Sequence, residues 1–180
     1  MDERKGFKEL FLLTPESCAM KAYLDIETSF GGEITIIGVF CPPDRVIQLV
    51  GEEVNSTNLW NALEGVSEIL TYNGARFDLP VIKRAARLDL AKYFECHDLM
   101  YDCWKRDLYG GLKRVEERLG IERGSKGIDG MEAMRLWERF RVDRDEAALK
   151  TLLEYNRDDI VNLYHLENHL RNIPPKGKKG

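Results

Sequence analysis

Tyr23-Leu24-Asp25-Ile26-Glu27-Thr28 reads as a buried strand that carries two carboxylates. Successive residues of a strand point to opposite faces, so Asp25 and Glu27 share one face while Leu24 and Ile26 occupy the other. Neighbouring carboxylates resist ionisation unless a positive charge lies between them. Because hard oxygen ligands select Mg²⁺ or Mn²⁺, the pair predicts part of a divalent-metal site. The alternative is a solvated strand end.

Further strands are expected after this one. Two β-rich runs, residues 34–40 and 45–50, follow turns at Gly31-Gly32 and at Cys41-Pro42-Pro43-Asp44, which predicts an antiparallel meander. From residue 55 onward the pattern alternates between helix and strand, with strands expected over 69–72 and 93–97. This order of elements indicates an α/β fold.

Helices are predicted between and after these strands. Their expected ranges are 56–63, 78–88, 112–119, 129–140 and 145–170. Asp78 and Asp98 each precede a helical pattern, so each is interpreted first as a helix N-cap. For Asp78 a role as a metal ligand is compatible with capping.

The last predicted helix, residues 145–170, is the longest. At about 100° per residue, Leu149, Leu152, Ile160, Leu163 and Leu170 fall on one face, which predicts the buried side. Asp159 lies at the edge of that face, whereas Asp158 points toward solvent. Tyr155 is one turn before Asp159 and is therefore its neighbour on the helix surface. Asn156 lies within the apolar face, so its amide must find hydrogen-bond partners.

Composition limits the class of protein. A chain of 180 residues with a net charge of -4 predicts a single domain that does not coat nucleic acid by bulk charge. No apolar run approaches the roughly 18 residues of a membrane helix, so a cytoplasmic protein without membrane contact is expected. The four cysteines have neither zinc-ligand nor disulfide spacing. The expected organisation is an N-terminal extension (1–19), one domain (20–170) and a disordered basic tail (171–180).

Three motifs resemble those of the DEDD exonuclease superfamily, tyrosine subclass. They are Asp25-Ile-Glu27-Thr28, Tyr72-Asn73-Gly-Ala-Arg-Phe77-Asp78-Leu-Pro80 and Tyr155-Asn156-Arg-Asp-Asp159. The second motif is similar to that of the proofreading domains of family-B DNA polymerases. Residues 20 to 170, including His97-Asp98-Leu99 and Gly111-Leu112-Lys113, look most like stand-alone YprB-type ribonuclease-H-like domains. The resemblance implies a mixed five-stranded sheet flanked by helices, with the second strand antiparallel.

The resemblance also implies roles for individual residues. Asp25, Glu27, Asp78 and Asp159 would bind two Mg²⁺ or Mn²⁺ ions, and Tyr155 would orient the attacking water. The implied activity is hydrolysis of phosphodiester bonds from the 3′ end of DNA or RNA, with a single strand or a 3′ end as partner.

Other residues of these motifs leave alternatives open. Asn73 and Phe77 would hold the terminal nucleotide, although Phe77 could equally be a core residue. Lys113 and Arg114 could contact phosphates, but a solvated helix face is favoured. His165 and His169 are spaced by four residues without the glutamate position that a zinc protease requires, which argues against that class.

The competing hypothesis is a nuclease-fold module that binds nucleic acid or a partner protein without cutting. A proofreading subunit acting with a polymerase in trans is a further alternative. All five expected active-site positions carry competent residues, which favours the enzyme.

Overall fold

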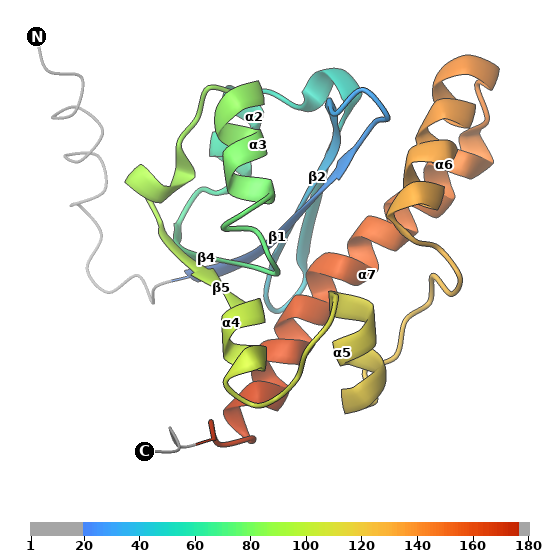
Figure 1. Ribbon diagram of the computed structural model, residues 1–180. Coiled ribbons are helices and arrows are strands. Elements are labelled where there is room, and N and C mark those ends of the chain that lie inside the picture. The colour runs from blue at the N-terminus through green and yellow to red at the C-terminus, as the bar shows by residue number, and fades with distance from the viewer. Residues whose placement is uncertain (1–19, 177–180) are drawn as a thin grey trace, which may run out of the picture.

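The computed structural model describes residues 20–176 and contains one mixed sheet of five strands in the order β3-β2-β1-β4-β5 (Figure 1). The expected N-terminal extension, residues 1–19, lies outside the described residues, as do residues 177–180 of the expected tail. The strands are β1 (Met20–Thr28), β2 (Ile34–Cys41), β3 (Arg45–Val50), β4 (Val66–Thr71) and β5 (Glu95–Asp98).

Strand directions agree with the fold class that the sequence predicts. β2 runs antiparallel to both β1 and β3, whereas β4 pairs in parallel with β1 and with β5. The meander therefore forms one half of the sheet and the β/α units form the other. The expected mixed α/β sheet of five strands, with its second strand antiparallel, is confirmed.

Helices cover both faces of this sheet (Figure 1). One face, with Leu24 and Ile26, packs against α2 (Ser56–Ala62) and α3 (Asp78–Ala85) and continues to Leu90 of η2 (Leu90–Lys92). On the other face Tyr23 packs against side chains of α4 (Leu99–Trp104), α5 (Leu112–Leu119) and α7 (Glu146–Arg171). A third cluster joins Ile36 of β2 to α6 (Gly130–Asp143) and α7. The single turn η1 (Gly51–Glu53) follows β3.

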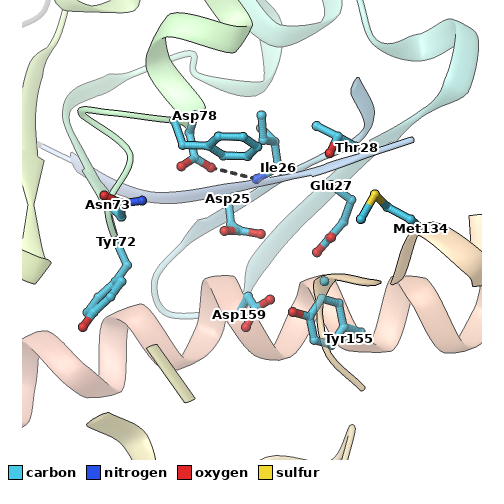
Figure 2. Close-up of a pocket in the computed structure, with 12 residues that line it drawn as sticks. Asp25, Ile26, Glu27, Thr28, Tyr72, Asn73, Asp78, Met134, Tyr155 and Asp159 are labelled. Carbon is cyan, nitrogen blue, oxygen red and sulfur yellow. Dashed lines mark hydrogen bonds between the residues drawn. The ribbon is translucent and has the colours of Figure 1, made fainter. Parts of the chain in front are cut away.

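Helix α7 has the orientation that its apolar pattern predicts. Leu152, Ile160, Leu163 and Leu170 are buried, and Asp159 is buried beside them. The helix crosses the sheet face that carries Asp25 and Glu27, so the third motif lies opposite the first (Figure 2). The alternation of side chains between the two faces of β1 and the 3.6-residue period of α7 together bring these carboxylates into one region.

Two expected helix caps have different outcomes. Asp98 caps α4, with its carboxylate accepting a hydrogen bond from the Met100 N–H at 3.1 Å. The prediction for Asp78 is wrong, because Phe77 occupies the N-cap position of α3 and Asp78 is the first helical residue. The Asp78 side chain turns instead toward β1, where it accepts a hydrogen bond from the Ile26 N–H at 3.1 Å.

The chain after α7 contacts the segment that follows α4. The Lys176 N–H donates to the Lys105 carbonyl at 2.9 Å, and the Lys176 amine pairs with Asp107. Among residues 20–176, no helix combines the length and the apolar character needed to cross a membrane.

Candidate active site

A cavity of about 300 Å³ opens at the carboxyl end of β1, between the sheet and α7. The expected site residues Asp25, Glu27, Asp78, Tyr155 and Asp159 all line it, as do Asn73 and Phe77. Tyr72, Gly130 and Met134, among others, complete its wall. Segments far apart in the sequence therefore meet at one concave site, whose volume is at the lower end of small-molecule pockets.

Three carboxylates converge on the floor of this cavity. Asp25 and Glu27 extend from β1 toward Asp159 on α7 (Figure 2). One carboxylate oxygen from each residue lies within 4.8 Å of the other two. Three hard oxygen donors at this separation form a ligand set that suits a divalent cation.

Electrostatics support a positive occupant of this cluster. Burial raises the pKa of Asp25 and Glu27 well above the usual range, and the nearby charges of Asp159 and Asp78 raise both further. Burial also raises the pKa of Asp159. A divalent cation would allow these groups to ionise together, so the residues present fit such an ion.

Asp78 approaches the cavity from the start of α3, outside the set of three. Burial raises its pKa to about 7, although hydrogen bonds from its own N–H and from that of Ile26 oppose the rise. The bond to Ile26 ties the start of α3 to β1 between the two other motif carboxylates (Figure 2). The structure thus brings the fourth expected carboxylate to the same cavity.

A chain of hydrogen bonds from β3 through α7 to β1 orients Asp25. The Asn156 amide donates to the Asp25 carboxylate at 3.3 Å and accepts from the Gln48 amide at 2.9 Å. Gly38 of β2 is paired with Asp25, and a Cβ at Gly38 would lie 2.3 Å from the Asn156 oxygen. Only glycine therefore lets α7 approach β1 closely enough for this contact. The buried amide of Asn156 has the partners that its position requires.

Tyr155 lies beside the carboxylates and is only 6% exposed. Burial and the charges of Asp159 and Glu27 raise the pKa of its phenol, which therefore stays protonated. The Lys113 amine lies 4.4 Å from the centre of the Tyr155 ring and donates to the Ile128 carbonyl. The expectation of a solvated face is wrong for Lys113, because α5 turns this residue toward the site; Arg114 is exposed.

Arg123 is a site residue that sequence reasoning missed. Its guanidinium donates to both Glu116 oxygens, at 2.9 and 2.8 Å, and to the Asp159 carboxylate at 2.6 Å. Burial opposes this charge, but Asp159 and Glu116 raise the pKa of Arg123 above its usual range. A signal was present in Glu116, which occupies the apolar stripe of α5 between Leu112 and Leu119 and so requires a buried partner.

The prediction that Asp158 points toward solvent is wrong. Its carboxylate accepts hydrogen bonds from the Ser125 N–H at 2.7 Å and from the Ser125 hydroxyl at 2.6 Å. Both bonds hold the loop after α5, the same loop that carries Arg123. Asp158 therefore faces the loop after α5, and the periodicity of α7 alone could not predict where that loop lies.

The second motif forms a fixed loop at the cavity rim. Asp98 accepts hydrogen bonds from the N–H groups of Asn73, at 2.8 Å, and Ala75, at 3.2 Å. Asn73 adopts a left-handed conformation with φ of 62°. Phe77 is 45% exposed, so core packing is excluded and its ring is available to a ligand.

Comparison with known proteins identifies the family. The sequence profile of the RNase_H superfamily matches residues 22–171. A search of curated proteins gives no match. Among solved structures, the chain is similar to the family B DNA polymerase from the hyperthermophilic archaeon Pyrobaculum calidifontis, with a TM-score of 0.67 and 17% sequence identity over 88% of this chain. That match spans 25% of the polymerase chain, so this chain corresponds to about a quarter of its length. The chain therefore belongs to the RNase H superfamily.

Proposed function

We propose that the protein is a metal-dependent exonuclease that hydrolyses phosphodiester bonds from the 3′ end of DNA or RNA. The observation that carries this proposal is the convergence of Asp25, Glu27 and Asp159 within 4.8 Å, in a cavity shared with Asp78 and Tyr155. We assign the activity to the domain of residues 20–170.

Asp25, Glu27, Asp78 and Asp159 would hold two divalent cations, Mg²⁺ or Mn²⁺. When bound, such ions supply positive charge to the reacting phosphate and activate a water molecule. In the proposed reaction, the water oxygen forms a bond to phosphorus while the bond from phosphorus to the 3′ oxygen breaks. The product is a nucleoside 5′-monophosphate.

The role we assign to Tyr155 is orientation of the attacking water. Its raised pKa keeps the phenol neutral, so it can donate and accept hydrogen bonds but is a poor base. Its place one turn before Asp159 directs the hydroxyl toward the carboxylate cluster (Figure 2). Tyr155 therefore acts by positioning the water rather than by removing its proton.

Arg123 and Lys113 supply fixed positive charge beside the cluster. The Glu116 carboxylate holds the Arg123 guanidinium against Asp159, and Lys113 lies over the Tyr155 ring. Fixed charges in a site shielded from water stabilise negative charge that develops on a phosphate. We assign both residues to the electrostatics of the reaction.

Cleavage of single strands labelled at the 3′ or 5′ end tests the proposed function. With Mn²⁺, we expect release of mononucleotides from the 3′ end, and none with EDTA or with Asp25→Asn. Parallel DNA and RNA substrates identify the sugar that the site accepts. If the folded protein binds these strands and releases no nucleotide, the result would contradict the proposed enzyme and support the competing hypothesis of a module that binds nucleic acid without cutting it.

A further inference from the structure

A group of aromatic and basic side chains continues from the cavity toward α4. We name it the α4 rim and define it by five residues, Arg76, Tyr101, Trp104, Tyr109 and Arg114. Two contacts connect this rim to the cavity wall.

The first connection is made by Tyr72, which lines the cavity. Its hydroxyl donates to the Gly110 carbonyl at 2.7 Å. Gly110 follows Tyr109 in the chain, and a Cβ at Gly110 would lie 2.7 Å from the Arg114 side chain. The loop between α4 and α5 is therefore held against the cavity wall by Tyr72.

The second connection is made by the loop of the second motif. Phe77 lines the cavity, and its neighbour Arg76 places its guanidinium 5.9 Å from the centre of the Trp104 ring. Tyr101 contacts Trp104 edge to face, with ring centres 5.3 Å apart. A path of flat side chains therefore runs from the cavity onto α4.

The charge along this path favours an anion. Among residues 20–176, neither Arg76 nor Arg114 forms an ion pair. The nearby carboxylates are neutralised, since Asp102 pairs with Lys105 at 2.9 Å and Asp107 pairs with Lys176. Two unpaired guanidinium groups thus remain beside exposed aromatic surface, which includes Tyr109 at 55% exposure.

We propose that the α4 rim binds the second and third nucleotides of a single strand whose 3′-terminal nucleotide occupies the cavity. The inference rests on the proposed function, because the cavity sets where the strand ends. Trp104 and the Arg76 guanidinium provide flat surfaces on which unpaired bases stack, and Arg114 faces the phosphates. Bases in a duplex are already stacked, so the rim selects single strands. Stacking is tolerant of sequence, so the site accepts any base.

Substrates of increasing length separate the rim from the cavity. The p-nitrophenyl ester of thymidine 5′-monophosphate fills the cavity alone, whereas an oligothymidylate of eight nucleotides also covers the rim. We expect Arg76→Ala and Trp104→Ala each to lower kcat/KM for the longer substrate about tenfold, a typical effect of losing one base stack. Hydrolysis of the p-nitrophenyl ester should not change.

Matched variants control for charge and aromatic content. Arg84→Ala removes an exposed arginine from the end of α3, and Tyr93→Ala removes an exposed aromatic residue after η2. Both should cleave the longer substrate at the wild-type rate. Arg76 is exposed, so Arg76→Ala should fold normally. It therefore tests the rim even if Trp104→Ala has a folding defect.

Binding distinguishes failure of the rim from failure of the proposed function. Anisotropy of labelled oligothymidylate, measured with Asp25→Asn as the parent protein, requires no cleavage. Tighter binding of eight nucleotides than of two, lost with Trp104→Ala, supports the rim even if the protein cuts nothing. Any of three results would overturn the inference. They are an affinity that does not depend on oligonucleotide length, rim variants that bind as tightly as the parent protein, and an equal affinity for a duplex.

Discussion

The hydroxyl of Tyr155 can be removed without changing the packing of its ring. Tyr155→Phe should lower kcat about 10²-fold, a typical scale for losing one orienting or acid-base group. Metal affinity and the thermal midpoint should stay close to wild type, because a neutral phenol is a poor Mg²⁺ ligand. Single-turnover cleavage with Mn²⁺ measures the effect. A rate within about twofold of wild type would remove Tyr155 from the mechanism.

Arg123 connects the stability of the fold to the site. Arg123→Ala leaves the buried Glu116 carboxylate, which is 1% exposed, without its cation. Removing one partner of a buried ion pair typically lowers the free energy of unfolding by about 3–5 kcal/mol. Urea denaturation checks this value, and Arg157→Ala, an exposed position on α7, is the control that should change it little. A loss below about 1 kcal/mol for Arg123→Ala would mean that the pair contributes as a surface salt bridge does.

At the scale of elements, the contact between β2 and α7 depends on Gly38. Gly38→Ala would place a Cβ 2.3 Å from the Asn156 oxygen and displace the amide that orients Asp25. We expect a loss of about 1–3 kcal/mol in the free energy of unfolding, the usual range for overpacking, together with a loss of cleavage. Gly111→Ala, where a Cβ would meet nothing within 4 Å, is the matched control.

A double-mutant cycle isolates this contact. In an Asn156→Ala background the atom that clashes with residue 38 is absent, so Gly38→Ala should cost less stability than it does alone. Thermal or urea unfolding of the four proteins gives the interaction energy. Additive effects would locate the strain elsewhere in β2.

Elements with strong periodicity were predictable from the sequence. Side chains of β1 alternate between the two faces of the sheet, and the apolar residues of α7 fall on one side of that helix, so the sequence alone assigns a direction to Asp25, Glu27 and Asp159. The two-residue period of β1 fixes that direction strictly. The longer period of α7 also identified the buried side of that helix correctly.

Interactions that depend on loops were not predictable in the same way. Arg123 and Ser125 lie between α5 and α6, where no period constrains the chain, so their contacts with Asp159 and Asp158 needed the tertiary structure. Asp78 shows the same limit at a helix end. Its local sequence favoured a cap, but the N–H of Ile26, a residue 52 positions earlier, is its partner.

At the scale of the whole molecule, the clustered carboxylates predict how stability changes with pH. Asp25, Glu27, Asp78 and Asp159 have higher pKa values in the folded protein than in the unfolded chain, so the folded state binds their protons more tightly. Their contribution is complete below about pH 4 and is lost as pH rises through the folded pKa, which is about 7 for Asp78. The protein in EDTA should therefore become less stable between about pH 5 and 8.

Divalent cations should reverse this loss, because they replace the protons that leave the cluster. Mn²⁺ at about 100 times its dissociation constant adds about 2.7 kcal/mol to the free energy of unfolding. The gain in thermal midpoint should be larger near pH 7.5 than near pH 5.5, where protons compete with the metal.

Carboxylates with lowered pKa, such as Asp102 and Glu167, stay ionised across this window and do not alter the trend. Thermal unfolding at both pH values, in EDTA and in Mn²⁺, measures the difference, and Asp25→Asn should remove most of it. An equal midpoint with and without Mn²⁺ near pH 7.5 would contradict a metal site at these four residues.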